Sequence, residues 1–122
     1  MSGKILIYGA SGGIGSASAR LLAERGHSLH LVGRNQSAIE TLADQLQSSF
    51  SVGDVNEVGF FEGVSQAAGD SLSGLIYAIG SINLKALMRL NRADFLRDFE
   101  RNALGAALAV QAALPALKKG WR

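Results

Sequence analysis

A chain of 122 residues, 48% of them hydrophobic, is long enough for one domain with a single hydrophobic core and too short for two substantial domains. The formal net charge of +2 is too small and too dispersed to indicate a nucleic-acid-binding protein. The chain has no cysteine, which excludes disulfides and thiolate chemistry and gives no sign of an oxidising compartment.

A strand begins almost at the N-terminus and leaves no room for a signal peptide, and no apolar run approaches the length of a membrane span. We therefore expect a cytoplasmic protein that does not contact membranes, with residues 1–122 as one domain. His27 and His30 have no histidine, cysteine or carboxylate partner at ligand spacing, so the sequence predicts no metal site.

Short apolar runs alternate with helical patterns along the chain. The strands that this alternation predicts span residues 3–8, 28–33, 49–53 and 74–79. The second and fourth are nearly continuous apolar runs, which is typical of parallel strands covered by helices on both faces. The order predicts an α/β fold, a doubly wound parallel sheet with a layer of helices on each side.

Glycines cluster between the first strand and a predicted helix over residues 14–25. Such a loop lets the backbone approach a pyrophosphate closely, and the N–H groups at the start of the helix point at the anion. We expect a dinucleotide to contact the following residues: Gly9, Ser11, Gly12, Gly13, Ile14 and Gly15. The alternative is a tight turn without a ligand, and the strand–loop–helix context favours the phosphate-binding loop.

The spacing of these glycines leaves two frames open. The common G-x-G-x-x-G fingerprint does not fit, because Ser18 stands at its third glycine when the frame starts at Gly13. Either Gly13 or Gly12 completes the motif with Gly9 and Gly15. The Ser11 hydroxyl either binds the same phosphate or stabilises the turn.

Arg34 follows the second strand, 19 residues past Gly15. An acidic residue here would bind the ribose of NAD, whereas an arginine accommodates the 2′-phosphate of NADP. The sequence therefore predicts NADP in preference to NAD. The alternative is a solvated arginine at a strand end.

Helix starts and the last helix are also predicted from local patterns. Residues 37–40 and 54–57 both match the capping box, which makes Asp54 the expected N-cap of the third helix. The last helix, over residues 95–117, is apolar nearly all round and is expected to be covered on several sides. Pro115 is expected to bend or end it.

The chain resembles the short-chain dehydrogenase/reductase family, and specifically its N-terminal, cofactor-binding half. The family motif Thr-Gly-x-x-x-Gly-x-Gly matches Gly9, Gly13 and Gly15, with Tyr8 in place of the threonine. The resemblance implies a Rossmann-like fold with strand order 3-2-1-4, a nicotinamide cofactor and carbonyl/alcohol redox chemistry.

The resemblance extends to other site residues. Asp54 and Val55 fall where the family contacts the adenine ring. The segment 77–80 (YAIG) corresponds to the family's Asn-Asn-Ala-Gly after the fourth strand and keeps only its glycine, so Ala78 and Gly80 are expected to line the cofactor. Gly80 also falls at the crevice where open α/β sheets bind ligands, although a simple turn is the alternative.

The last helix carries the catalytic part of the resemblance. Residues 100–105 (ERNALG) resemble the segment that holds the family's catalytic asparagine, and Asn102 is the matching position. The alternative is a buried asparagine bonded to backbone. The family's catalytic serine and Tyr-x-x-x-Lys follow this helix, and the 122 residues contain no such tyrosine, since Gly12 and Ser81 stand four residues after Tyr8 and Tyr77.

We therefore expect the NADP(H)-binding domain of an oxidoreductase that ends before the catalytic half and does not transfer hydride efficiently alone. The alternatives are a non-catalytic dinucleotide-binding or oligomerisation module, or a chain completed by another polypeptide. In the family's strand order, residues 75–79 form an edge strand. We expect a homo-oligomer joined by this edge, by the helix over residues 95–114, or by an exchange of elements.

Overall fold

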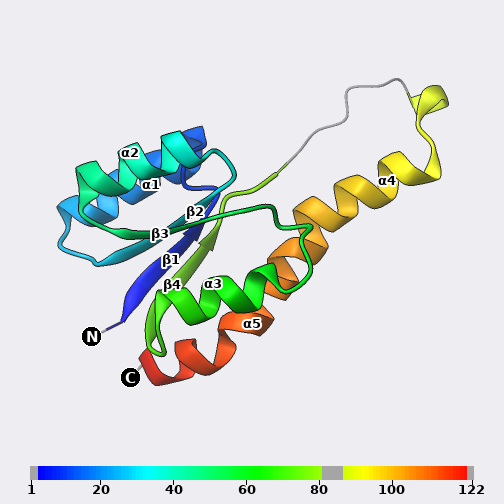
Figure 1. The fold of residues 1–122 in the computed structure, drawn as a ribbon. Helices are drawn as coiled ribbons and strands as arrows, with labels where there is room; N and C mark the ends of the chain where they lie inside the picture. The colour runs from blue at the N-terminus through cyan, green and yellow to red at the C-terminus, as the bar shows by residue number, and fades with distance from the viewer. Residues whose placement is uncertain (1–2, 81–86, 121–122) are drawn as a thin grey trace.

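The computed structural model describes residues 3–80 and 87–120 as a four-stranded parallel sheet with flanking helices (Figure 1). The strands are β1 (Lys4–Tyr8), β2 (Leu29–Gly33), β3 (Ser49–Val52) and β4 (Leu72–Tyr77). They lie in the order β3-β2-β1-β4, and every pairing is parallel. The predicted doubly wound sheet and its strand order are confirmed.

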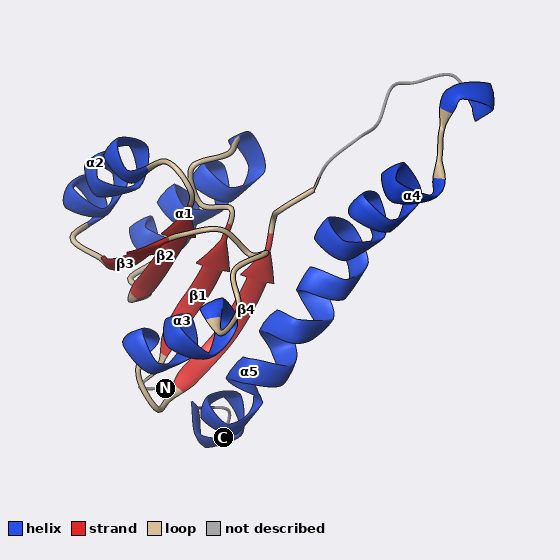
Figure 2. Ribbon diagram, turned by 45° about the vertical axis from the view of Figure 1, so that its right-hand side comes forward, coloured by secondary structure: helices blue, strands red, loops and turns tan. Residues whose placement is uncertain are grey.

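Helices cover both faces of the sheet. The helical elements are α1 (Gly13–Glu24), α2 (Gln36–Leu46), α3 (Phe60–Ala68), a 3₁₀ turn (Leu87–Arg89), α4 (Arg92–Phe99), a π-helical turn (Glu100–Leu104) and α5 (Gly105–Gly120). Figure 2 shows α1 and α2 on one side of the sheet, α3 and α5 on the other, and α4 extending away from it. Across the described ranges, no helix has both the length and the hydropathy to cross a membrane.

The strands divide their side chains between two hydrophobic clusters, one under each helical layer. In β1, Leu6 and Tyr8 pack with α3 and α5, whereas Ile7 packs with α1 and α2. Successive side chains of a strand point to opposite faces, so a strand covered on both sides must be apolar throughout. This requirement explains the continuous apolar runs from which the strands were predicted.

Strand β4 begins and ends two residues earlier than the sequence predicted. Its last residue, Tyr77, pairs with Tyr8, the last residue of β1. Beyond this pair, Gly9 has a φ of 77° and turns the chain out of the sheet, so β4 loses its partner. The residues from Ala78 to Gly80 therefore lie in a loop, where they are accessible to a ligand.

The last helical region differs from the single helix expected over residues 95–117. It starts at Arg92, changes to π-helical hydrogen bonding over Glu100–Leu104, and continues through Pro115 to Gly120. Pro115 therefore does not end the helix, and the bend that was the other expectation stays a prediction. The side chains of Ala109, Ala113 and Ala116 are buried against the sheet and α3.

The composition of this helix led us to expect that other elements pack against several of its sides. Within the part of the chain that the structure describes, they do not. Leu108, Val110 and Leu114 are each about two-fifths exposed.

Both predicted capping boxes are displaced from the true helix starts. Helix α2 is capped by Asn35, whose side chain accepts a 3.1 Å hydrogen bond from the N–H of Ala38. The box at residues 54–57 forms a turn instead, because α3 begins only at Phe60, after Gly59 in a left-handed conformation. Asp54 is therefore not an N-cap.

His30 is buried within the sheet, with 1% of its surface exposed. Its Nδ1 lies 2.6 Å from Ser49 Oγ and its Nε2 lies 2.8 Å from Ser51 Oγ, both on the neighbouring strand β3. Burial, and secondarily the charge of Lys4, lowers the pKa of His30 to about 4. The folded protein therefore holds this imidazole neutral.

This burial predicts acid destabilisation. In the unfolded chain His30 binds a proton below its ordinary pKa of 6.5, whereas in the folded chain it stays neutral down to about pH 4. The contribution of the neutral His30 to the free energy of unfolding is therefore fully present above pH 6.5. It is lost as the pH falls from 6.5 to 4, by about 3 kcal/mol in total. Urea unfolding across this range should show the decline in the parent and in His27→Gln, but not in His30→Gln. An equal decline in all three would contradict the prediction.

Candidate functional site

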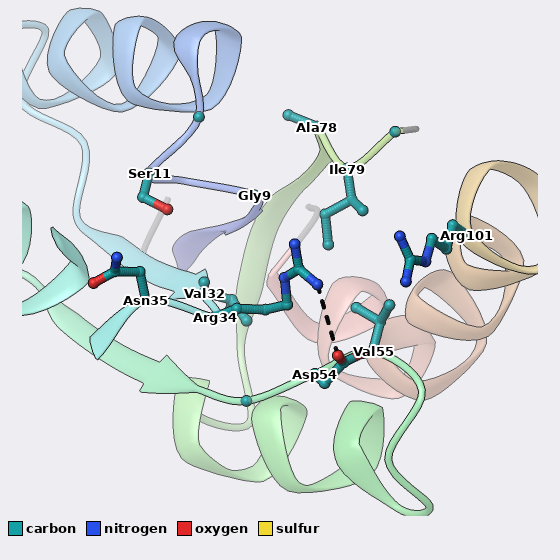
Figure 3. A pocket seen from close by; sticks show the side chains of 14 residues that line it. Gly9, Ser11, Val32, Arg34, Asn35, Asp54, Val55, Ala78, Ile79 and Arg101 are labelled. Carbon is teal, nitrogen blue, oxygen red and sulfur yellow. Dashed lines mark ion pairs between the residues drawn. The ribbon is translucent and has the colours of Figure 1, made fainter. Parts of the chain in front are cut away.

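A cavity of about 290 Å³ lies at the carboxyl ends of the four strands (Figure 3). The carboxyl ends of parallel strands meet at one edge of a sheet, so the four loops that follow them converge there. Most of the lining comes from these loops and one residue comes from the π-helical turn: Gly9, Ser11, Gly12, Val32, Gly33, Arg34, Asn35, Gly53, Asp54, Val55, Ala78, Ile79, Gly80 and Arg101.

Two glycines of the first loop are required by the fold itself. Gly9 has a φ of 77°, and a Cβ on it would lie 2.7 Å from the carbonyl oxygen of Ala78. Gly15 is buried, and a Cβ there would overlap the carbonyl oxygen of Gly9. The missing side chains let α1 start directly against the end of β1, where its N-terminus faces the cavity edge.

Packing does not exclude a side chain at the other residues of this loop. Gly12 is the N-cap of α1, and its N–H donates to the carbonyl oxygen of Gly9 at 3.1 Å. A Cβ on Gly13 would meet nothing within 4 Å, and Ile14 is 78% exposed. Gly13, Ile14 and Gly15 do not line the cavity, whereas Gly9, Ser11 and Gly12 do.

The two glycine frames share Gly9 and Gly15, the two positions that packing requires, so both frames remain open. Ser11 is exposed, and its hydroxyl forms no hydrogen bond within residues 3–80 and 87–120. That hydroxyl therefore does not stabilise the turn.

Arg34 and Asp54 face each other across the cavity. Arg34 Nη1 lies 3.8 Å from Asp54 Oδ2, with 68% of the arginine side chain exposed (Figure 3). A turn orients the carboxylate, since Asp54 Oδ1 accepts from the N–H of Asn56 and the N–H of Asp54 donates to Glu57 Oε1, both at 2.9 Å. An exposed pair at this separation is weak, so the guanidinium remains available to a stronger anionic partner.

The π-helical turn is attached to the end of β4 by a tyrosine. Tyr77 Oη donates a 2.8 Å hydrogen bond to the carbonyl oxygen of Arg101. A Cβ on Gly105 would overlap this hydroxyl, so glycine is needed for the close approach. Burial raises the pKa of Tyr77 above its ordinary value, which keeps the donated proton in place.

Asn102 lies in the same turn, beside the cavity but not in its lining. Its side chain is exposed, so the interpretation as a buried asparagine does not apply. A Cβ on Gly80 would lie 3.2 Å from Asn102 Oδ1, which places the amide next to the loop after β4. The structure thus brings the predicted catalytic asparagine close to the predicted cofactor loop.

Six lining residues were not predicted. Five of them lie within two residues of a strand end, so their position at the crevice edge was a usable signal: Val32, Gly33, Asn35, Gly53 and Ile79. Arg101 had no such signal, since it lies in the middle of a helical pattern. Within the described ranges, no group of three or more histidine, aspartate or glutamate side chains could hold a metal ion.

Comparison with known proteins identifies the family. The family model described as short chain dehydrogenase matches residues 3–122. This chain belongs to the short chain dehydrogenase family. Members of this oxidoreductase family use a nicotinamide dinucleotide, and the cavity at the strand ends is where a Rossmann-like sheet binds one.

Two relatives show how the length of this chain compares with that of other proteins of the family. The chain is 34% identical over 122 residues to a 3-oxoacyl-[acyl-carrier-protein] reductase from Bos taurus, covering 95% of this chain and 51% of that protein. It is 32% identical to carbonyl reductase family member 4 from Danio rerio, covering 93% and 51% respectively. The chain thus spans about half the length of the curated relatives it matches.

Solved structures share the fold. The short chain dehydrogenase from Shigella flexneri superposes with a TM-score of 0.87 at 22% identity, covering 98% of this chain and 51% of that one. A variant of actinorhodin polyketide ketoreductase, solved with NADPH, gives a TM-score of 0.84 at 22% identity, covering 93% and 47%. At these identities the likeness establishes the fold.

The packing of the first loop predicts different effects on stability for two Gly→Ala substitutions. Gly15→Ala places a methyl group against the carbonyl oxygen of Gly9 and should lower the free energy of unfolding by about 2 kcal/mol. Gly13→Ala meets open space in the first turn of α1 and should leave stability unchanged or raise it by up to about 1 kcal/mol. Urea unfolding measures both, and equal stabilities would contradict the assigned packing.

Proposed function

We propose that this chain is the NADP(H)-binding domain of a short chain dehydrogenase that interconverts carbonyl and alcohol groups. The observation that carries the proposal is Arg34, a guanidinium beside the cavity where an acidic residue would bind the ribose of NAD. The actinorhodin ketoreductase, which shares the fold and was solved with NADPH, supports the same choice.

The residues at the cavity fit such a cofactor. The backbone around Gly12 and the N-terminus of α1 are suited to a pyrophosphate, with the free hydroxyl of Ser11 as an additional donor. Arg34 would pair with the 2′-phosphate in place of Asp54, and Asp54 would then accept from the adenine amino group beside Val55. We also assign cofactor contacts to Gly9, Gly13, Ile14, Gly15, Ala78 and Gly80.

When bound, the nicotinamide supplies or accepts the hydride, and the chain's own residues position it. Asn102, next to Gly80, is our candidate for a catalytic role at that end of the cofactor. We propose that these 122 residues bind the cofactor without efficient turnover by themselves, since they contain no Tyr-x-x-x-Lys. The cytoplasmic location stays a prediction.

NADPH should bind more tightly than NADH, because only NADPH carries the 2′-phosphate for Arg34. A charge-assisted contact of this kind corresponds to about a tenfold or greater difference in Kd. Arg34→Ala should abolish the difference by weakening NADPH binding alone. Isothermal titration calorimetry with both nucleotides on both proteins measures the effect, and equal affinities in the parent chain would refute the NADP assignment.

A second candidate function is assembly, favoured by an apolar surface on the last helices. The exposed large side chains of α4, the π-helical turn and α5 are Phe95, Leu96, Phe99, Leu104, Leu108, Val110 and Leu114. So many exposed large apolar side chains along one helical region favour a protein–protein interface there. We propose a homo-oligomer joined by the helix over residues 95–114, and the edge of β4 over residues 75–79 is the alternative.

Charged substitutions on the exposed side of α5 should therefore dissociate the oligomer. The double variant Val110→Glu/Leu114→Glu places two carboxylates on the proposed interface and should be monomeric. Leu21→Glu, at a half-exposed leucine of α1 on the opposite side of the sheet, is the matched control and should keep the parent's mass. Light scattering at micromolar concentration provides the readout, and a monomeric parent would rule out this assembly.

A further inference from the structure

The cavity contains a second guanidinium, opposite Arg34. Arg101 reaches it from the π-helical turn, and Figure 3 shows its guanidinium beside Val55 and near Ile79. These two apolar side chains are half-buried and come from the loops after β3 and β4. The cavity therefore has a polar end around Ser11 and Gly12 and an apolar end that Arg101 borders.

Arg101 differs from Arg34 in its partners. Arg34 is ion-paired with Asp54, whereas the guanidinium of Arg101 forms no ion pair or hydrogen bond with any residue in the ranges that the structure describes. The side chain is nonetheless half-buried. With two guanidinium groups and one carboxylate, the lining of the cavity carries a net positive charge.

The fold itself fixes the position of Arg101. Its carbonyl oxygen accepts the 2.8 Å hydrogen bond from Tyr77, at the end of β4. The same tyrosine occupies the space left by the missing side chain of Gly105. An α-helix interrupted by a π turn is often found at functional sites, because the extra residue changes the direction in which side chains point. Here the anchored turn directs Arg101 to the cavity.

We propose that Arg101 is a further cofactor-binding residue. Its guanidinium, beside Val55 and Ile79, lies against the adenine base. This rests on the proposed function. A planar guanidinium stacks on aromatic rings and is more weakly hydrated than an ammonium, so a half-buried site beside apolar walls suits it. The base is common to NADPH and NADH, so Arg101 contributes equally to both, in contrast to Arg34.

The test compares nucleotide affinities by calorimetry. Arg101→Ala should weaken both NADPH and NADH by about tenfold and leave the ratio of their Kd values unchanged. Arg101→Lys keeps the charge but not the planar group, and should show most of the same loss. Arg25→Ala, which removes an arginine at the end of α1 away from the cavity, is the matched control and should bind as the parent does.

Two fragments locate the contact. Arg101→Ala should weaken adenosine 2′,5′-bisphosphate, which contains the base, and should not affect reduced nicotinamide mononucleotide. Thermal unfolding of each variant checks that the domain is intact, and Arg101→Lys serves as the test should Arg101→Ala unfold.

The outcomes separate the two proposals. A parent that binds neither NADPH nor NADH refutes the proposed function. A parent that binds, with variants of Arg101 that bind as well as the parent, refutes only the role of Arg101. A changed NADPH/NADH ratio in Arg101→Ala would assign this residue to the 2′-phosphate, and full affinity in Arg101→Lys would show that charge alone matters. Either result overturns the contact with the base.

Discussion

The site depends on one backbone contact, between Gly15 at the start of α1 and the carbonyl oxygen of Gly9 at the end of β1. Neither residue has space for a side chain, and Gly9 adopts a positive φ that other residues rarely reach. This contact lets α1 begin directly beneath the strand ends. The N–H groups of its first turn then face the same edge of the sheet as the loops after β2, β3 and β4.

Parallel pairing brings the remaining parts of the site to that edge. The N–H of Gly9 donates to the carbonyl oxygen of Val32, the N–H of Gly53 to that of Gly33, and the N–H of Ala78 to that of Tyr8. Each loop is therefore attached to the end of the neighbouring strand. Loop residues held in this way can be short and still present defined groups to a ligand, as Asp54 does through its own turn.

The helical side of the site is joined to the sheet through Tyr77. Its hydroxyl contacts the π-helical turn at Arg101 and fits against Gly105, so it holds the end of β4 against the last helical region. Asn102 and Arg101 are adjacent in this turn, one beside Gly80 and the other in the cavity lining. One hydrogen bond thus relates the candidate catalytic residue and the newly proposed binding residue to the same strand.

The sequence by itself determined the alternation of strands and helices, the glycine turn and the position of Arg34, because these depend on apolar periodicity and on residues at strand ends. It misplaced the helix starts near Ser37 and Asp54, because Asn35 caps α2 two residues earlier and α3 begins after Gly59, which has no capping side chain. Only the tertiary structure decided that β4 ends at Tyr77, since pairing with β1 sets its length. The same holds for Arg101, because its approach to the cavity requires a π turn and a tyrosine 24 residues earlier in the chain.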